Sequence, residues 1–506
     1  MQKGQPANIS LTVDLHITEF AAGAVTVKES GCTNIVFDQF QDGKWYATQR
    51  PGVNQLADAS EDVSDERGRG CYYWDAVGAK YFVNADTVYK TDYTGDLAAT
   101  ISDGTDRVFI YEAGDYLVII DQENDEGWYI DSAADTTLVQ ITDGDFPTPL
   151  ARGGAVLNGK LYLMNTSGEI QESDIEDPTS WDSLNFITAE VEPDGGVILS
   201  KHHEHIVAIG NRTLEFFYDA GNATGSTLSV RTDIQYDIGA IKADSLAQIG
   251  NRIYFVGQDK SGAVGVYMLD NFNLQKVSSE TVGTFLTSAV MTDEVDIVGS
   301  GFVSGGRDFY MVTTYNIIGD IVPVETLVYV STRGWWGNWD LELPDVDKCP
   351  LVDWMPSDTT RAGEGILSNG DLITIVDDFT PVDVVKSATV YESGIYESGI
   401  YSATAGYGSN IPFEIITGDF DGGSPRKKTQ GDLWLMHMPI SAQESVTIAV
   451  ADDQASGYTD GRSLSVYDKD ARLNRNGSYR RRNHKVSGSL SKQIRMESLT
   501  FPVRIG

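Results

Sequence analysis

Short apolar segments recur along most of the 506-residue chain, each followed by a turn of polar residues, Gly or Asn. Segments of this length, rich in Val, Ile and Tyr, are typical of β-strands. They begin at residues 80, 116, 160, 205, 252 and 307, so the spacing is 36 to 55 residues. The copies are Lys80–Asn84, Tyr116–Ile120, Lys160–Met164, His205–Ile209, Arg252–Val256 and Arg307–Val312, with a weaker seventh at Gly365–Ile373.

A period of roughly 40–50 residues with several short strands per repeat indicates the blades of a β-propeller. One blade cannot bury both of its faces, so blades must stack around a common axis. Long segments with a helical period are scarce. The best helix candidate opens at Ser279, a plausible N-cap, and contains Phe285, Leu286 and Val290. The pattern therefore predicts an all-β protein.

The pattern also divides the chain into three parts. Residues 1–75 are predicted to form an N-terminal β segment with a turn at Arg50-Pro-Gly52. Residues 76–380 carry the repeat and are predicted to form a β-propeller-like domain. Residues 381–506 contain longer alternating strands, which predict a β-sandwich-like C-terminal domain joined by N-terminal strands.

The last strand changes its buried face part-way along. Ile494 and Met496 share one face, whereas Leu499 and Phe501 share the other. Because side chains alternate strictly along a regular strand, one extra residue must be inserted between the two pairs. The pattern predicts a β-bulge near Glu497–Ser498.

The chain carries 74 acidic and 37 basic residues, a net charge of −37. Such a surface favours solubility, and it also suits the wall of a channel that passes DNA without gripping it. General nucleic-acid binding is disfavoured, because it relies on Lys and Arg neutralising phosphates.

The charge is not evenly distributed. Residues 462–506 contain 11 Lys/Arg and 3 Asp/Glu, a net of +8, so the remainder carries −45. The densest basic point is Arg480, Arg481 and Arg482, and a second run is Arg426-Lys427-Lys428. These runs are interpreted either as a solvated strand face or as candidate assembly contacts for an acidic partner or another copy's acidic face.

A duplicated segment supplies further candidate contacts. Tyr391-Glu-Ser-Gly-Ile395 is followed by Tyr396-Glu-Ser-Gly-Ile400 and then Tyr401. A period of five fits neither a flat strand nor a helix, so we expect a glycine-bent ribbon or a projecting loop. Exposed tyrosines are good contact residues. A duplicated loop without function is the other interpretation.

The cysteines and the apolar segments give evidence about the cellular compartment in which the chain folds. Cys32, Cys71 and Cys349 are widely spaced, which fits core residues of a chain folded in a reducing cytoplasm rather than a disulfide framework. The N-terminal residues contain no apolar signal-peptide region. No apolar run approaches the length of about 18 residues that a membrane span requires.

Candidate chemistry is sparse. No nucleophile elbow, phosphate-binding loop or HExxH motif is present. His202-His203-Glu204-His205 suggests either a metal site or a polar turn. Asp121–Gly127 and Asp419–Gly423 resemble calcium loops incompletely, and acidic hairpin turns are the commoner explanation. Trp335-Trp336-Gly-Asn-Trp339 suggests either a sugar-stacking platform or a buried aromatic knot.

Two neighbouring segments carry a family resemblance. Gly210–Asn222 reads GNRTLEFFYDAGN, and Tyr236–Gly262 reads YDIGAIKADSLAQIGNRIYFVGQDKSG. These segments resemble the packaged-DNA stabilisation proteins, the tail hub or nozzle proteins, of short-tailed phages. The chain departs from the family at Lys242 and Lys276, where Arg or Pro is expected. Neither departure touches chemistry, because the family has none.

The resemblance implies a non-enzymatic virion protein of the tail, made in the host cytoplasm and without a cofactor. Members of this family are similar in forming a hexameric ring below the portal and its adaptor. Such a ring extends the DNA channel without sequence-specific binding, helps to retain packaged DNA and attaches a needle, fibres or spikes.

Two other functions compete with this one. A glycan-binding or glycan-cleaving β-propeller that is secreted would carry a signal peptide. A cellular propeller scaffold would show stronger identity between blades, such as a WD or kelch signature.

Overall fold

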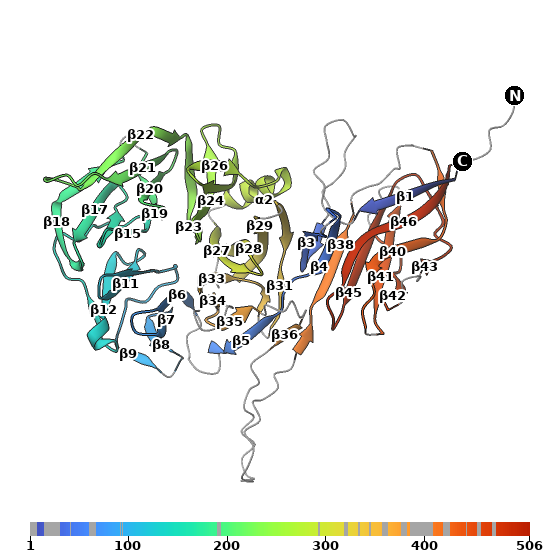
Figure 1. The fold of residues 1–506 in the computed structure, drawn as a ribbon, viewed down its shortest axis with the longest axis horizontal. Helices are drawn as coiled ribbons and strands as arrows, with labels where there is room; N and C mark the ends of the chain where they lie inside the picture. The colour runs from blue at the N-terminus through green and yellow to red at the C-terminus, as the bar shows by residue number, and fades with distance from the viewer. Residues whose placement is uncertain are drawn as a thin grey trace, which may run out of the picture.

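The computed structural model has two parts, a ring of small sheets and a second β-rich part that contains the first and the last strand, β1 and β46 (Figure 1). The structure describes residues 8–505 except 15–30, 41, 60–66, 92, 94, 190–193, 292–293, 318–321, 332–333, 344–345, 357–362, 376–381, 385–407, 418–425, 442, 453–456 and 468–471. Almost every regular element in this part of the chain is a strand, which confirms the all-β prediction.

Six blades of a β-propeller each consist of four consecutive antiparallel strands. The first blade contains β6 (Gly68–Trp74), β7 (Ala79–Asn84), β8 (Thr87–Lys90) and β9 (Asp96–Thr100). The second contains β10 (Phe109–Ala113), β11 (Tyr116–Asp121), β12 (Glu126–Asp131) and β13 (Leu138–Gln140), with the short helix η1 (Ser132–Ala134). The third contains β15 (Ala155–Leu157), β16 (Lys160–Met164), β17 (Glu169–Asp174) and β18 (Asp177–Thr188).

The next three blades follow in chain order. The fourth blade contains β19 (Gly196–His202), β20 (His205–Gly210), β21 (Leu214–Asp219) and β22 (Leu228–Tyr236), and β14 (Arg152–Gly153) pairs with its first strand. The fifth contains β23 (Ile238–Ile249), β24 (Arg252–Asp259), β25 (Val264–Asp270) and β26 (Asn273–Lys276). The sixth contains β27 (Val295–Ser304), β28 (Arg307–Asn316), β29 (Val322–Val330) and β30 (Trp335–Asn338). Each of the six repeats found in the sequence lies on the second strand of a blade, so the propeller prediction is confirmed.

A seventh sheet closes the ring. It contains β33 (Leu351–Met355), β34 (Glu364–Leu367) and β35 (Leu372–Ile375), and the N-terminal strand β5 (Val53–Ala57) pairs antiparallel with β35. The innermost strand β33 lies between β27 and β6. The weak seventh repeat therefore marks β34 and β35. Because the fourth strand comes from the other end of the chain, the N-terminal segment ties the ring shut.

The axis of the propeller is occupied by charged side chains. Arg107 precedes β10 in the second blade, yet its guanidinium donates to the carbonyls of Leu246 (2.8 Å) and Gly299 (3.0 Å) and to Asp353 (2.7 Å). These three partners belong to β23, β27 and β33, so Arg107 reaches strands on three other blades. A register shift in β23 between Lys242 and Ala247 produces the bulge that includes Leu246.

Arg152 adds a second cation at the axis. It forms ion pairs with Asp106 and, at 3.1 Å, with Asp244 of the β23 bulge. Burial raises the pKa of the Asp244 carboxyl to about 7. These paired charges connect the second, fourth and fifth blades near the centre of the ring.

The second part consists of two sheets. One contains β1 (Asn8–Asp14), β3 (Ile35–Gln39), β4 (Trp45–Gln49), β39 (Lys428–Gln430), β40 (Leu433–Met438), β43 (Arg472–Leu473), β44 (Ser478–Tyr479) and β46 (Arg495–Ile505). The other contains β2 (Gly31–Thr33), β38 (Pro412–Ile416), β41 (Ser445–Asp452), β42 (Arg462–Ser465) and β45 (Arg482–Ser489). Strand β2 also pairs with β30, so this sheet is continuous with the sixth blade.

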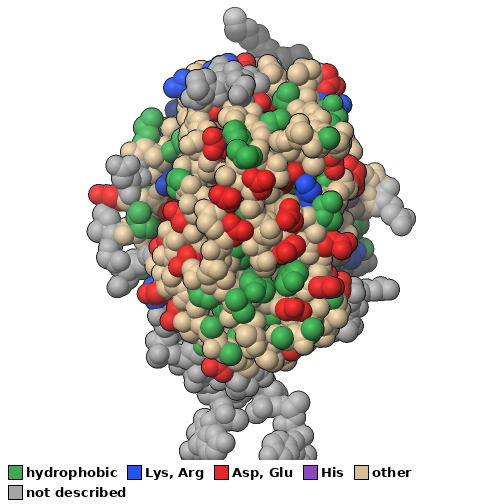
Figure 2. All heavy atoms as spheres, turned by 90° about the vertical axis from the view of Figure 1, so that its left-hand side faces the viewer, with side chains coloured by type: hydrophobic (Ala, Val, Ile, Leu, Met, Phe, Trp, Pro, Cys, Tyr) green, Lys and Arg blue, Asp and Glu red, His purple; other side chains and the backbone are tan. Residues whose placement is uncertain are grey.

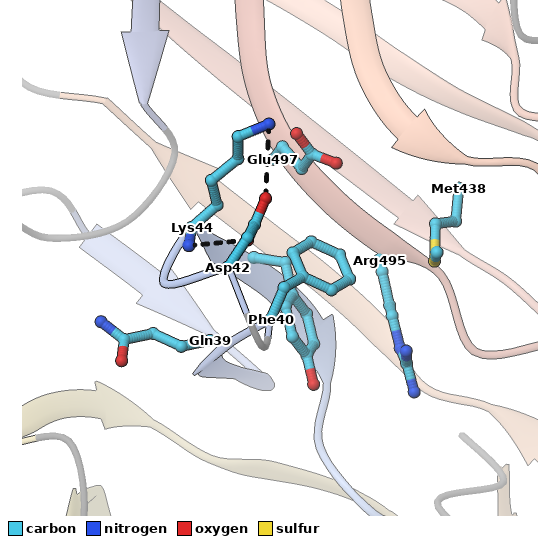
Figure 3. A pocket seen from close by; sticks show the side chains of 8 residues that line it. Gln39, Phe40, Asp42, Lys44, Met438, Arg495 and Glu497 are labelled. Carbon is cyan, nitrogen blue, oxygen red and sulfur yellow. Dashed lines mark hydrogen bonds and ion pairs between the residues drawn. The ribbon is translucent and has the colours of Figure 1, made fainter.

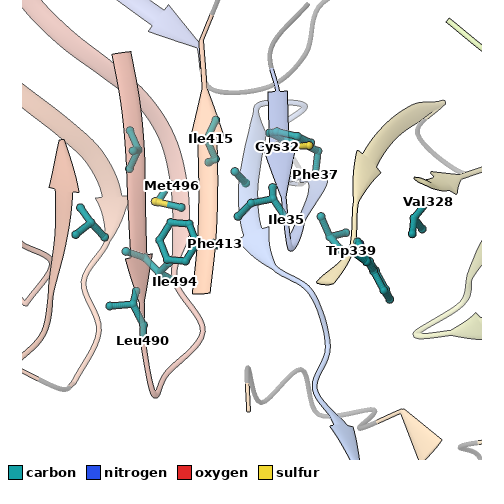
Figure 4. Close-up of a cluster of buried hydrophobic side chains, with 14 of the residues drawn as sticks. Cys32, Ile35, Phe37, Val328, Trp339, Phe413, Ile415, Leu490, Ile494 and Met496 are labelled. Carbon is teal, nitrogen blue, oxygen red and sulfur yellow. The ribbon is translucent and has the colours of Figure 1, made fainter. Parts of the chain in front are cut away.

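One buried cluster connects the two sheets with the propeller. Phe413 and Ile415 of β38 face Met496 of β46, while Ile35 and Trp339 continue the cluster towards the sixth blade (Figure 4). All of these side chains are at most 3% exposed. The N-terminal strands thus complete the C-terminal part. The propeller begins at Gly68, inside the segment 1–75.

Three shorter pairs and one helix complete the described fold. Strands β31 (Asp340–Leu343) and β32 (Val346–Lys348) form a hairpin, and β36 (Val382–Val384) pairs with β37 (Gly408–Asn410) and β5. Helix α2 spans Glu280–Val290, and the hydroxyl of Ser279 accepts a hydrogen bond from the Val282 amide, as predicted for an N-cap.

The bulge expected in the last strand is present. Met436 of β40 lies opposite Ser498, but His437 lies opposite Met496, so Glu497 is the extra residue. Met496 and Leu499 are both fully buried. The extra residue lets side chains of both parities face one core.

A buried ion pair lies where the propeller meets the second part. The Arg50 guanidinium binds both carboxylate oxygens of Asp383, at 2.9 and 2.5 Å, and both side chains are fully buried. Asp383 also accepts from the Val53 amide at 3.0 Å, while Arg50 donates to the Asp340 carbonyl at 2.7 Å and to the Asn34 side chain at 3.0 Å. This node lies at the Arg50-Pro-Gly52 turn, directly before β5.

We predict that Arg50→Ala lowers the free energy of unfolding by about 3–5 kcal/mol, because it leaves the Asp383 carboxylate buried without its charge partner. Differential scanning calorimetry with limited proteolysis checks this, and cleavage near β5 is expected first. Lys44→Ala is the control, since its pair with Asp42 is 3.6 Å long and largely exposed. Equal melting temperatures for the two variants would contradict the prediction.

Candidate functional site

The two basic runs of the sequence come together on one strand pair. Strands β39 and β44 are antiparallel, with Lys428 opposite Tyr479. The residues just before β39 therefore lie beside those just after β44. We define the basic cluster as the four cationic residues that this pairing gathers: Arg426, Lys427, Arg480 and Arg481. Arg426, Lys427 and Arg480 are exposed, and Arg481 is half-buried.

A buried lysine supports the cluster from below. Lys428 is 1% exposed, and its ammonium donates to the backbone carbonyls of Arg426 (3.1 Å) and Arg480 (2.9 Å). Its Nζ atom also lies 5.8 Å from the ring centre of Tyr479. Because one ammonium binds the backbone of both runs, it fixes their relative position and leaves the outer side chains pointing away from the core.

Arg482 is buried in the folded chain, which corrects the expectation that it is an exposed assembly contact. It is 2% exposed. Its guanidinium binds both carboxylate oxygens of Asp452, at 2.5 and 2.7 Å, and donates to the Gln430 side chain and the Asn476 carbonyl, both at 2.6 Å. It also stacks 4.3 Å from the Tyr479 ring centre. Arg482 begins strand β45, so strand alternation turns it inward.

The structure describes two of the other predicted contact residues and leaves three outside the described part of the chain. Arg480 and Arg481 belong to the basic cluster, Arg480 exposed and Arg481 half-buried. Tyr391, Tyr396 and Tyr401 lie outside the described residues.

A groove of about 560 Å³ lies on the same sheet as the basic cluster (Figure 3). The β3–β4 hairpin contributes Phe40 and Tyr46, whose ring centres are 4.4 Å apart. The Arg495 guanidinium of β46 lies 5.2 Å from the Tyr46 ring centre, and Met438 of β40 is 48% exposed. Aromatic and cationic groups at one concave place can hold a side chain of a partner protein.

The histidine run forms a hairpin turn. His202 ends β19, His205 begins β20, and His203 has a positive φ of 53°. The Phe272 amide donates to Nε2 of His202 at 3.1 Å, which requires a neutral imidazole. Burial lowers the pKa of His202 to about 4. Among the described residues no group of three metal-ligating side chains is arranged around a metal position, so the polar turn is the better interpretation.

The candidate calcium loop at Asp121 and the tryptophan segment both have structural roles. Asp121, first of the calcium-like residues, pairs at 2.9 Å with the fully buried Arg69. Trp336 is 8% exposed and donates to the Val277 carbonyl at 2.9 Å, while Trp339 is fully buried. Trp336 and Trp339 therefore belong to the buried core, and these two rings do not form an exposed surface on which a sugar could stack. The calcium-like segment at Asp419 lies outside the described residues.

The three cysteines are free and buried, as expected for core residues. Burial raises the pKa values of the Cys32 and Cys349 thiols to about 12. In the part of the chain that the structure describes, no helix is both long enough and apolar enough to cross a membrane.

Comparison with known families supplies the identity. A family model described as "Bacteriophage P22 Gp10, beta-propeller" matches residues 33–313. The chain belongs to this family. The match spans more than half of the sequence and includes both segments that carried the resemblance, which is thereby confirmed. This member of the family is a phage structural protein of the tail and DNA-stabilisation class, with a β-propeller fold.

Solved structures show only distant likeness. The N-terminal domain of Nup159 has 7% sequence identity and a TM-score of 0.39, and the alignment covers 68% of this chain and 98% of that one. A mitotic checkpoint complex chain has 11% identity and a TM-score of 0.35, covering 64% and 93%. YCF48 bound to a D1 peptide has 13% identity and a TM-score of 0.34, covering 64% and 96%. No curated protein matches the sequence.

We predict that Arg482→Ala lowers the free energy of unfolding by about 2–3 kcal/mol, because it removes a buried cation that four groups surround and leaves the Gln430 and Asn476 acceptors without their donor. Arg480→Ala, at an exposed neighbouring position, is the matched control and is expected to change stability by about 0.5 kcal/mol or less. Chemical denaturation measures both. A loss for Arg480→Ala as large as that for Arg482→Ala would argue against the distinction between the two arginines.

A second prediction concerns acid stability. His484 is fully buried on β45, and neither ring nitrogen has a hydrogen-bond partner among the described residues. Burial, together with the nearby Arg482 charge, lowers the pKa of His484 to about 3. The unfolded chain protonates near pH 6.5, so it binds a proton that the folded chain excludes. Stability is therefore complete above pH 6.5 and falls as the pH decreases from there towards 3.

His484→Leu should remove this part of the pH dependence. Between pH 7.5 and 5 the variant is expected to lose about 2 kcal/mol less stability than the parent chain. Urea unfolding of both proteins at the two pH values measures the difference. Parallel losses would show that the folded imidazole takes up its proton over the same pH range as the unfolded one.

Proposed function

We propose that this phage protein is a tail hub, or nozzle, that forms a homohexameric ring below the portal and adaptor. The observation that carries the proposal is the family match over residues 33–313. The fold supports it, because a closed propeller joined by a continuous sheet to a second β part makes a rigid building block. The protein is proposed to be a component of the virion tail, made in the host cytoplasm.

The DNA channel is proposed to lie between subunits and not along the propeller axis. Arg107 and Arg152 form ion pairs and hydrogen bonds to several blades across that axis. The net charge of −37 suits a wall that DNA slides past, because few cations are present to displace counterions from the phosphates. Binding to DNA is thus proposed to be weak and independent of sequence.

The ring is further proposed to contact the head-to-tail adaptor on one side and a needle, fibre or spike protein on the other. The function needs no cofactor and no catalytic residue. Arg480 and Arg481 are proposed as assembly contacts, and so are Tyr391, Tyr396 and Tyr401 of the duplicated segment.

Phage particles made without this protein should package DNA and then lose it, because the channel below the portal is left open. The fraction of DNA-filled particles, measured by electron microscopy and by nuclease-resistant DNA over several hours, tests this. Adding the purified protein back before the DNA escapes is the control and should preserve filled particles. Filled particles that remain stable without the protein would refute the proposed function.

A further inference from the structure

The third blade has an acidic outer surface. Residues 161–200 contain nine Asp or Glu and no Lys or Arg. We define the acidic face as three exposed carboxylate residues on and beside β17 and β18, namely Asp174, Glu176 and Asp182. Figure 2 shows that carboxylates far outnumber cations over the whole end of the propeller where this blade lies.

Exposed apolar side chains accompany these carboxylates. Ile175 is 66% exposed and Leu184 is 75% exposed, and both lie on the same two-strand unit as the acidic face. Register shifts between Gln171 and Asp174 let the middle of β18 bulge away from β17, which projects Leu184 outwards. Apolar groups rimmed by charge are typical of protein contact surfaces.

The basic cluster is the electrostatic complement of this face. It gathers four cations on the C-terminal part of a chain whose remaining residues are strongly acidic. Lys428 holds the two runs together through its bonds to the backbone of both. The third blade and the C-terminal sheets lie at opposite ends of the long axis of the molecule (Figure 1).

We infer that the basic cluster of one copy docks on the acidic face of the third blade of a second copy. This inference rests on the proposed ring. A head-to-tail contact joins two different patches, and it closes into a ring when the rotation between copies permits. Opposite charges at opposite ends of one chain meet this requirement, since they favour head-to-tail contact and oppose contact between like ends.

A DNA backbone is the other anion that the cluster could bind. Four cations are few for a duplex, and the surrounding chain of net charge −37 repels phosphates. An acidic protein surface with an apolar centre fits the cluster better, because the partner's carboxylates and the cluster's guanidinium groups pair directly.

The experiment compares four full-length chains: the parent, Arg480→Glu/Arg481→Glu, the same chain with Asp174→Lys/Glu176→Lys added, and the control Arg212→Glu/Lys492→Glu. Both control residues are exposed and lie outside the two surfaces. Calorimetry first establishes equal folding. Complementation then measures the yield of complete tails, and a photo-reactive residue at position 427 identifies what the cluster touches in them.

We expect the arginine reversal to lower the yield of tails at least about tenfold, and the added lysines to restore much of that loss, since the charges are then exchanged across the contact. The control should assemble like the parent. Cross-links from position 427 should reach residues 161–200 of a second copy. Assembly of the purified chains at about 50 and 500 mM salt should show the effect mainly at low salt, where screening is weak.

Three results would overturn the inference. Normal tails from the arginine reversal would show that the cluster is a solvated surface. Cross-links to DNA, or to another tail protein in place of a second copy, would assign it a different partner. Rings that assemble normally while position 427 cross-links nothing would reject this contact and leave the proposed tail hub intact, because that proposal is tested separately by loss of packaged DNA.

Discussion

The buried ion pair between Arg50 and Asp383 determines how the two parts of this protein are joined. Taking both charges out of water costs several kcal/mol, so the pair contributes mainly a specific geometry rather than net stability. Each remaining polar atom of the pair has a defined partner: the Val53 amide, the Asp340 carbonyl and the Asn34 side chain. Strand β5 starts at Val53 and completes the seventh sheet. Closure of the ring and attachment of the C-terminal sheets therefore depend on one node.

Buried or half-buried cations fix geometry at three other places. Arg107 connects inner strands of four blades, Arg69 holds the Asp121 hairpin, and Lys428 and Arg482 organise the ends of β39, β44 and β45. With 37 basic residues against 74 acidic ones, cations are scarce in this chain. Several of them nevertheless lie inside. A rigid framework and an acidic outer surface follow from the same distribution.

Side chains and carbonyls from several blades meet at the axis of this propeller. Propellers commonly enclose a central channel, but here the bulge of β23 places Asp244 and the Leu246 carbonyl within reach of Arg152 and Arg107. These contacts connect several blades across the axis. Under the proposed function, the lumen for DNA lies between copies of the chain, so the surfaces between copies carry that function.

Much of the fold could be predicted from the sequence, because strand and helix patterns report which face of a local segment is buried. Six repeats mark the second strands of the blades and the weak seventh marks β34 and β35. Ser279 caps α2, and the change of parity before Leu499 locates the bulge at Glu497. Each of these signals lies within about ten residues. The match to residues 33–313 likewise confirms the family that two short segments suggested.

The tertiary structure alone decided which distant segments meet. Strand β5 joins β35 from the other end of the chain, and β39 beside β44 unites basic runs that are about fifty residues apart. In the sequence Arg482 is indistinguishable from Arg480 and Arg481. It is buried because β45 begins at that residue and turns its side chain towards Asp452. Arg107 likewise gives no local sign of its place on the axis. Such pairings depend on the packing of whole sheets, which no local pattern of apolar and polar residues encodes.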